Sequence, residues 1–407
     1  MKVRKRGSNV RYAIGLSTVL IMGSLAACSS AGGSDGSATG ATKGDPIEVL
    51  QTGTVDSPIL SVPGTQIGGE VAVAAINAAG GINGRPLKVE FCDDKSNPSL
   101  ASQCVQKAMS NGAVARVGGY GVNGNTILPI LDNASMADFG GYPATPVENS
   151  NRVSFPLAAG ANIYAGFGGL AKAMHSDAQK YLVVNSVLNG VEKRIEIVDK
   201  SMQAAGLERL SGVTVPSNTA DLSSIVGQIK RADPDIVIGL LSPSDLTKYW
   251  SAANALGLTK PLMTQTSGLT PDVLKTAGSG LAWTSFATGY PSYNGSAPGA
   301  ADFRSQMAKY APGKELTLDA WGPWVAMNAL ASILRSMSGP INSETVLAAV
   351  KGTNCLNAAY LKCLDLSKPG PLSDSPALRV GTVYLLTAKD GQFYPTDFSA
   401  SIFPGSK

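Results

Sequence analysis

Four of the five cysteines fall into two closely spaced pairs that could form disulfides. Cys92 and Cys104 are twelve residues apart, and Cys355 and Cys363 are eight residues apart. In an exported chain such local pairs are typical of disulfides, with buried free thiols as the alternative. A metal site is less favoured, because the chain has a single histidine, His175, and no Cys-x-x-Cys motif. We therefore predict two disulfides and no metal.

The spacing of three glycines suggests a different chemistry, the binding of a dinucleotide. Gly119, Gly121 and Gly124 form a Gly-x-Gly-x-x-Gly pattern between an expected strand and an expected helix. The pattern follows the third expected strand, whereas the dinucleotide fingerprint follows the first, and no acidic residue lies about 20 positions beyond it. An NAD-dependent oxidoreductase is therefore a remote alternative. We expect no enzyme activity and no cofactor.

The first 27 residues have the pattern of an export signal. Five basic residues accompany an apolar stretch from Ala13 to Met22, and small residues precede Cys28. The apolar stretch is too short to span a bilayer comfortably. The Leu-Ala-Ala-Cys sequence resembles a bacterial lipobox, in which the cysteine is lipidated and begins the mature chain. We predict a lipoprotein signal peptide over residues 1–27 and anchoring of Cys28 at the outer face of the cell membrane.

Composition argues against nucleic acid as a partner. The formal net charge is +4, but the leader holds five basic residues and no acidic one, so the rest of the chain is close to neutral. Residues 28–45 are mainly Ser, Gly, Ala and Thr, which predicts a flexible, lipid-anchored linker. About 360 residues remain, more than one hydrophobic core usually supports, so two lobes are expected.

Strand and helix patterns alternate along the remaining chain. The expected strands are residues 47–54, 87–91, 113–118, 137–142, 181–186, 210–215, 235–241 and 261–265, with a hairpin near 379–395. The expected helices are residues 65–79, 98–109, 125–133, 161–174, 191–205, 222–231, 244–256, 318–337 and 343–350. Two such series predict an α/β fold with two doubly wound, Rossmann-like lobes. The ligand site should lie where the carboxyl ends of their strands face each other.

The segment from Ile76 to Arg85 reads Ile-Asn-Ala-Ala-Gly-Gly-Ile-Asn-Gly-Arg. It closely resembles the signature of periplasmic-type solute-binding proteins of the branched-chain amino acid (Leu/Ile/Val) group. Asp93-Asp94, Asn97-Pro98 and Ala144-Thr145-Pro146 extend the resemblance. The glycines of the signature suit a tight turn from helix to strand, so we expect this segment to be scaffold and not binding site.

The resemblance implies a type I periplasmic-binding-protein fold whose two lobes close on a small solute by hinge bending. The closed form would dock on an ABC permease in the membrane, and we expect the protein to act as a monomer. Three crossings between the lobes are expected, near Gly160, Tyr290 and Leu372. The lobes would then comprise residues 46–160 plus 291–372 and residues 161–290 plus 373–407.

Candidate ligand contacts lie in loops that follow strands. The loop from Tyr120 to Thr126 opens a helix whose free N–H groups suit a carboxylate. By resemblance, Asn125 or Thr126 corresponds to a family serine that binds the ligand carboxylate, Thr145 to a family threonine, and Pro143 to a position that offers a backbone carbonyl. For each, an ordinary cap or turn residue is the alternative. The full predicted set is Gly121, Asn123, Asn125, Thr126, Tyr142, Pro143, Thr145, Asn189, Ser242 and Thr266.

Three of these positions depart from the amino-acid binders of the family. Asn189 and Ser242 stand where those proteins have aromatic residues, and Thr266 stands near the place of an acidic residue that pairs with the ligand ammonium. A buried ammonium without a carboxylate partner is costly. We therefore expect a neutral polar solute or a small carboxylate, not a simple zwitterionic α-amino acid. A sensory ectodomain that acts through a membrane partner is the alternative function.

Overall fold

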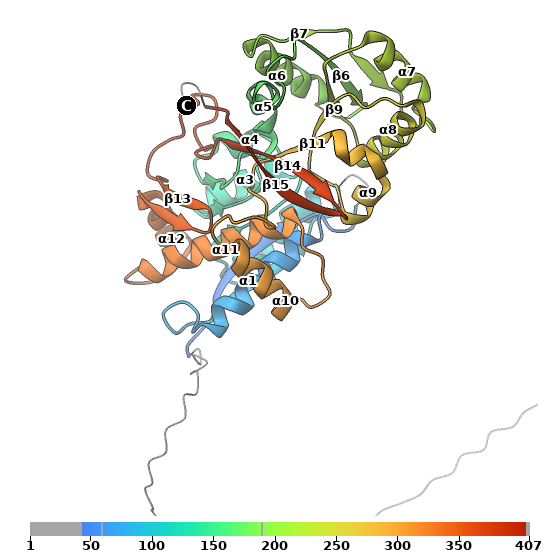
Figure 1. Ribbon diagram of the computed structural model, residues 1–407. Helices are drawn as coiled ribbons and strands as arrows, with labels where there is room; N and C mark the ends of the chain where they lie inside the picture. Colours follow the sequence, from blue (N-terminus) through green and yellow to red (C-terminus); the bar gives the residue numbers. More distant parts are fainter. Residues whose placement is uncertain (1–42, 58–59, 189, 404–407) are drawn as a thin grey trace, which may run out of the picture. The chain divides into compact units, whose positions relative to one another are not determined.

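The computed structural model describes residues 43–57, 60–188 and 190–403. The expected signal peptide, Cys28 and nearly all of the expected linker lie outside these residues, as does Asn189. The described residues belong to one compact unit, Thr39–Lys407. It contains two large β-sheets covered by helices (Figure 1). Within the described ranges, no helix has both the length and the apolar character needed to cross a membrane.

The first sheet has five parallel strands in the order β2-β1-β3-β4-β5. Its chain segment contains β1 (Ile47–Gly53), α1 (Gly64–Ala78), β2 (Leu87–Asp93), α2 (Pro98–Ser110), β3 (Ala115–Val117), α3 (Gly124–Asn133), β4 (Ala137–Phe139), α4 (Pro146–Ser150) and β5 (Ser154–Phe155). The strand order reverses direction beside β1, as in doubly wound sheets. The carboxyl ends of β1, β3 and β4 therefore open onto the same edge.

The second sheet follows the order β15-β14-β11-β10-β9-β6-β7, with β8 also paired to β6. Its elements are a 3₁₀ helix (Gly160–Gly166), α5 (Phe167–Met174), β6 (Lys180–Ser186), α6 (Val191–Ala204), β7 (Glu208–Arg209), β8 (Val213–Val215), α7 (Ser223–Ala232), β9 (Ile236–Leu240), α8 (Pro243–Leu256), β10 (Leu262–Gln265), α9 (Pro271–Thr276), a second 3₁₀ helix (Gly278–Trp283), β11 (Thr284–Thr288), β14 (Thr382–Lys389) and β15 (Gln392–Ser401). Strands β6 to β11 are parallel, while β14 and β15 pair antiparallel.

The chain passes between the two sheets three times. It leaves the first sheet after β5, leaves the second after β11, and returns to the second with β14. Between the last two passages it forms α10 (Ala300–Tyr310), α11 (Leu318–Ser336), α12 (Ser343–Gly352), β12 (Leu356–Ala358) and β13 (Leu361–Leu364). The predicted fold class, two doubly wound α/β lobes joined by three crossings, is confirmed. The lobe boundaries at Gly160, Tyr290 and Leu372 stay predictions.

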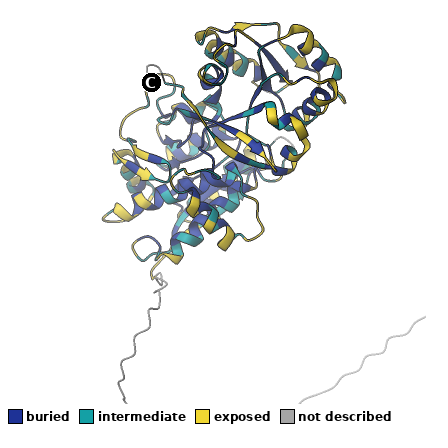
Figure 2. Ribbon diagram, in the orientation of Figure 1, coloured by how far each residue is buried: buried dark blue, intermediate teal, exposed yellow. Residues whose placement is uncertain are grey.

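Apolar side chains of the central strands build the core. Val49 and Leu50 of β1 and Val183 and Val184 of β6 are fully buried, and Figure 2 shows the strands mostly dark blue beneath helices whose outer faces are exposed. Burial on both faces also explains why β9, whose five residues are all buried, reads as a continuous apolar run in the sequence.

Helices α1 and α11 are close neighbours (Figure 1). Gly68 of α1 makes this approach possible, because a Cβ atom there would collide with the carbonyl oxygen of Ala320 in α11. The close packing also brings the first turns of both helices together beside the carboxyl end of β1.

Both predicted disulfides are present. Cys92 of β2 is bonded to Cys104 of α2, and Cys355 is bonded to Cys363 of β13. The first bridge fastens a strand to the helix that follows it, with Cys104 buried. The second closes the β12–β13 hairpin, where both cysteines are exposed.

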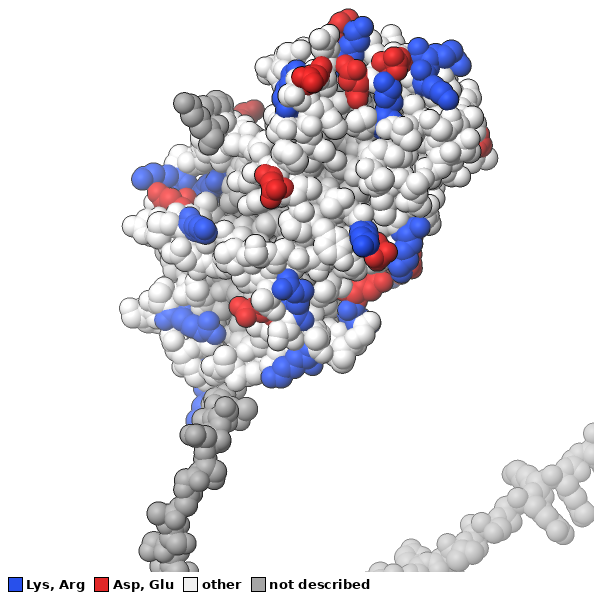
Figure 3. All heavy atoms as spheres, viewed as in Figure 1, with Lys and Arg blue, Asp and Glu red and all other residues white. Residues whose placement is uncertain are grey.

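Charged side chains are mixed on the face shown in Figure 3. Basic and acidic groups lie next to one another over the described residues of this face, and most of the area between them is uncharged. The helix α6, for example, pairs Glu196 with both Lys193 and Lys200. On this face the described residues therefore form no basic stripe of the kind that holds a nucleic-acid backbone.

Candidate functional site

A cavity of about 320 Å³ lies where the carboxyl ends of the two sheets meet. The first sheet contributes the loops after β1, β3 and β4, and the second contributes the loops after β10 and β11. The segment before α11 and the turn between β14 and β15 complete the wall. This is the position at which open α/β sheets bind ligands, and the volume lies within the range of small-molecule sites.

Aromatic side chains form much of the cavity wall. Tyr120 and Tyr142 have ring centroids 4.3 Å apart, and Tyr290 follows at 6.4 Å from Tyr142. Tyr293 and Phe393 also line the cavity and are almost completely buried. Burial raises the pKa of Tyr120, Tyr142 and Tyr290, so their hydroxyls stay protonated at neutral pH.

A polar contact joins the two lobes across this cavity. The Tyr142 hydroxyl, from the loop after β4, lies 3.5 Å from the hydroxyl of Ser267, from the loop after β10. Thr266, directly before Ser267, and Thr270, three residues after it, also line the cavity. Hydroxyl groups can both donate and accept hydrogen bonds, so this side of the cavity can bind a polar group of either kind.

Asp319 supplies a carboxylate to the opposite part of the lining. It lies in the first turn of α11, and its Oδ2 accepts a hydrogen bond from the backbone N–H of Gly64 at the start of α1, at 2.9 Å. Burial raises the pKa of Asp319, while Thr317 and Gly64 oppose the rise through hydrogen bonds. The carboxylate thus lies beside two helix N-termini, where negative charge is stabilised.

The other charged groups of the lining are Lys314 and Glu315, both exposed to solvent. Among the described residues that line the cavity there is no arginine, histidine, asparagine or glutamine. The side-chain groups available to a ligand are therefore mainly aromatic rings, aliphatic groups and hydroxyls.

Two residues of the predicted contact set, Tyr142 and Thr266, line the cavity. Asn189 lies outside the described residues. The other predicted residues lie outside its lining, in the loop after β3, the first turn of α3, the loop after β4 and the start of α8. Their part in ligand binding therefore stays a prediction.

The first turn of α3, predicted to receive a ligand carboxylate, already has a carboxyl group against it. The space beside Gly124 is occupied by the Glu148 side chain, whose Oε1 would lie 3.1 Å from a Cβ atom on that glycine. Asn123 is buried at the start of this helix, Thr126 is half-buried and Asn125 is exposed.

The Glu148 carboxyl group also accepts a hydrogen bond from the Thr145 hydroxyl. Its Oε2 accepts hydrogen bonds from the backbone N–H of Thr145 at 2.7 Å and from the Thr145 hydroxyl at 3.0 Å, which caps α4. Burial raises the pKa of Glu148 to about 7, with Asp138 adding to the rise and Arg116 opposing it. Arg116 and Asp138 form a buried ion pair below this loop.

Pro143 and Gly121 also have internal neighbours. The Pro143 carbonyl, predicted to face a ligand, accepts a hydrogen bond from the backbone N–H of Ala161 at 3.0 Å. Gly121 packs where a Cβ atom would lie 3.1 Å from Oδ2 of Asp94 and 3.3 Å from the Thr54 hydroxyl oxygen. The hydrogen bond holds the loop after β4 in place, and the tight packing leaves little room for a side chain at position 121.

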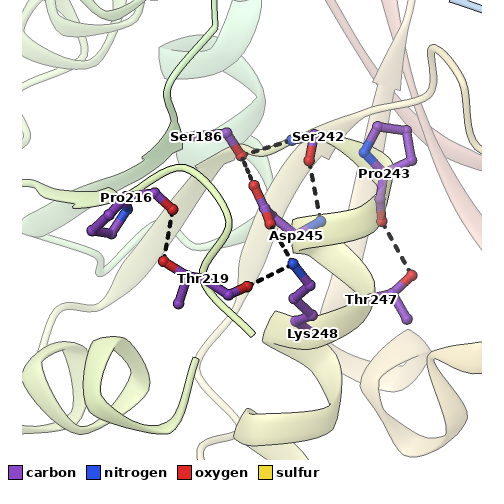
Figure 4. A network of polar contacts seen from close by, with 8 residues as sticks. All are labelled: Ser186, Pro216, Thr219, Ser242, Pro243, Asp245, Thr247 and Lys248. Carbon is purple, nitrogen blue, oxygen red and sulfur yellow. Dashed lines mark hydrogen bonds and ion pairs between the residues drawn. The ribbon is translucent and has the colours of Figure 1, made fainter. Parts of the chain in front are cut away.

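Ser242 belongs to a polar network at the carboxyl ends of β6 and β9 (Figure 4). Its hydroxyl accepts from the backbone N–H of Asp245 at 3.1 Å and caps α8, while its own N–H donates to the Ser186 hydroxyl at 3.0 Å. Ser186 donates to Asp245 at 2.6 Å, and Lys248 reaches both Asp245 and the Thr219 carbonyl. The network fixes the start of α8 and satisfies the Asp245 carboxylate within the lobe.

The sequence analysis did not predict several residues that line the cavity. Tyr120 lies in a loop that was singled out, yet it did not enter the predicted set. Ser267 follows the predicted Thr266 directly. Asp319 and Phe393 come from segments with no motif, and only the packing of α11 and of the β14–β15 hairpin brings them to the cavity.

Comparison with known proteins agrees with this architecture. A family model described as periplasmic binding protein matches residues 52–375. The fold is similar to an extracellular ligand-binding receptor from Verminephrobacter eiseniae, with 19% identity, a TM-score of 0.73, and coverage of 86% of this chain and 99% of that chain. No curated protein sequence gives a significant match.

Two further structures show how varied the ligands of this fold are. One is a branched-chain amino acid ABC transporter protein from Thermus thermophilus with bound valine. It is 15% identical to this chain, with a TM-score of 0.72, and the match covers 88% of this chain and 96% of that chain. The other is a fatty acid ABC transporter substrate-binding protein from Thermomonospora curvata. It is 13% identical to this chain, with a TM-score of 0.70, and the match covers 88% of this chain and 94% of that chain. At such identities the similarity establishes the fold alone.

Proposed function

Because the chain belongs to the periplasmic binding protein family, we propose that it is the extracytoplasmic solute-binding subunit of an ABC importer. The observation that carries the proposal is the cavity of about 320 Å³ enclosed by the strand-end loops of both lobes. Binding and release of a small solute are enough to account for a cavity of this kind.

The mechanism follows from the three crossings. Relative movement of the lobes about residues near Gly160, Tyr290 and Leu372 would open and close the cavity, and the solute would shift this equilibrium toward the closed form. Closure removes water, which strengthens each hydrogen bond inside the cavity. A permease in the membrane would then recognise the closed form.

We propose that the solute contacts the predicted residues Tyr142 and Thr266, together with Tyr120, Ser267 and Tyr290. They belong to the loops after β3, β4, β10 and β11. A solute held between Tyr142 and Ser267 touches both lobes, so its binding is coupled to their closure.

We propose that Cys28 carries the membrane anchor of the protein. Lipidation there, followed by the linker 28–45, would keep the protein at the outer face of the membrane and raise its effective concentration near the permease. A single acyl chain binds membranes only weakly, so at least two chains are expected.

The test combines binding with transport. The mature chain is screened by thermal shift against amino acids, aromatic acids, amides and polyols, where a ligand at 100 times its Kd adds about 2.7 kcal/mol to the free energy of unfolding. Small-angle scattering then follows compaction, and uptake of the same solute is compared in cells with and without the chain. Binding without any effect on uptake would favour the sensory alternative. Conversion of a solute by the purified chain, or NADH binding, would overturn the proposal.

A further inference from the structure

The lining of the cavity restricts the chemistry of the solute. Resting on the proposed function, we propose that the solute is neutral and contains a planar aromatic ring with a hydroxyl or carboxamide group. Ring stacking, the arrangement of charges and the hydroxyls of the lining each support this assignment.

The aromatic wall suits a flat ring. Tyr120, Tyr142 and Tyr290 form a continuous series, with centroid separations of 4.3 and 6.4 Å and interplanar angles of 30° and 37°. Aromatic pairs at such separations prefer offset or tilted stacking, so a further ring can extend the series. Leu269 and Leu274, from the second lobe, add aliphatic surface to the lining.

The charges of the lining disfavour an ionic solute. A carboxylate solute would find no arginine or histidine among the described lining residues, and Lys314 is exposed to water. An ammonium solute would have to share Asp319, whose Oδ2 already accepts from Gly64 and whose charge lies beside the N-termini of α1 and α11. The other acidic group of the lining, Glu315, is exposed to water like Lys314. An ion left without a partner in a closed cavity is costly, so a neutral molecule fits best.

The hydroxyls of the lining suit a group that both donates and accepts. Tyr142 and Ser267 form a hydroxyl pair 3.5 Å apart, long enough for either to exchange its partner for a ligand atom. The Tyr290 hydroxyl has no hydrogen-bond partner among the described residues, although the residue is 7% exposed. A phenol or carboxamide can bond to such groups, whereas a pure hydrocarbon would leave them unpaired.

The size of the cavity agrees with one or two rings. Its volume of about 320 Å³ is roughly twice that of a cavity of about 150 Å³ known to take up benzene. A ring of this kind with one polar substituent fills the aromatic side and reaches the hydroxyls.

The test uses probes of one size that differ in charge or ring type. Binding of benzamide, benzoate, benzylammonium, cyclohexanecarboxamide and L-leucine to the mature chain is measured by calorimetry. We expect benzamide to bind at least about tenfold more tightly than each of the other four. Equal or tighter binding of benzoate, benzylammonium, cyclohexanecarboxamide or leucine overturns the assignment, as does the absence of benzamide binding at about 5 mM.

Substitutions locate the binding site. Tyr142→Ala should weaken benzamide binding about tenfold through loss of stacking, while Tyr142→Phe should weaken it less than about threefold. Tyr394→Ala removes an exposed tyrosine of β15 outside the cavity and should leave binding unchanged. Equal affinities of the wild type and Tyr142→Ala would overturn the assignment.

The outcomes also separate this inference from the proposed function. Import of a charged solute that binds in the same cavity would leave the function standing and reject the solute class. Tight benzamide binding with no solute-dependent uptake would retain the class and reject the importer role.

Discussion

Asp319 accepts a hydrogen bond from the backbone N–H of Gly64, with 2.9 Å between Oδ2 and N, although 255 residues separate them. Gly64 begins α1 and Asp319 lies in the first turn of α11, so the carboxylate of one helix accepts from the first N–H group of a distant helix. The contact fixes the wall of the cavity on the side of the first lobe.

Replacing Asp319 by alanine should destabilise the protein by about 1 kcal/mol, the usual cost of losing a helix N-cap. Urea unfolding of the mature chain measures the change. Asp397→Ala, at an exposed position in β15, is the control and should stay within about 0.5 kcal/mol of wild type. Equal effects of both substitutions would show that the contact adds no stability.

Gly68→Ala should be among the most destabilising small substitutions in the first lobe. The new methyl group would collide with the carbonyl oxygen of Ala320, so α1 and α11 would have to separate. Overpacking of this kind costs about 1–3 kcal/mol. Gly352→Ala, at the end of α12 with no atom within 4 Å of the new methyl group, is the matched control. A midpoint in urea unchanged by Gly68→Ala would contradict the close packing of the helices.

Glu148 should make the stability depend on pH. Its pKa is raised to about 7 in the folded chain, against about 4.5 for the free group, so between these values the folded state holds a proton that the unfolded state has lost. The contribution of Glu148 to the free energy of unfolding is therefore full below about pH 4.5. It falls as the pH rises to 7, by up to about 3 kcal/mol.

Glu148→Gln provides the measurement for this pH dependence. The amide oxygen of glutamine can still accept from Thr145 but carries no titrating proton. We expect urea unfolding to show the variant gaining stability relative to wild type between pH 5 and pH 8. Parallel profiles of the two proteins would reject a raised pKa for Glu148.

The two disulfides should differ in their response to a reducing agent. Both cysteines of the Cys355–Cys363 bridge are exposed, whereas Cys104 of the other bridge is buried. A thiolate reaches an exposed sulfur faster, so differential alkylation followed by mass spectrometry should show Cys355 and Cys363 labelled first.

Removing the Cys92–Cys104 bridge by a double alanine substitution should cost about 3 kcal/mol, the chain-entropy value for a loop of its length. Unfolding in urea without a reducing agent gives the difference. A wild type that is no more stable than the double variant would mean that the bridge adds nothing to the folded state.

The sequence predicted the scaffold better than the cavity. Long amphipathic or continuously apolar segments, such as those of α1, β6 and β9, were placed to within a few residues, because their periodicity records burial directly. Strand β11 and helix α10 were not expected. Strand β11 (Thr-Ser-Phe-Ala-Thr) has little apolar alternation, and its place between β10 and β14 is set by pairing with them. The predicted helix at 161–174 begins as a 3₁₀ helix.

The residues of the cavity were only partly predictable. Tyr142 and Thr266 were found because they follow strands whose carboxyl ends had to face the site. The first turn of α3 stays a predicted ligand site, and the structure adds that the Glu148 side chain packs against Gly124 there. Asp319 could not be found, because its position depends on the packing of α11 against α1.

The three passages of the chain between the sheets have a consequence for folding during the proposed export. Neither lobe is encoded by a continuous stretch, because the first sheet needs α11 and the second needs β14 and β15. In the export that we propose, a polypeptide that emerges from its N-terminus could not complete either sheet until most of its length had crossed the membrane. Its early segments would keep apolar surface uncovered until then, so we expect such a chain to need protection from aggregation during export.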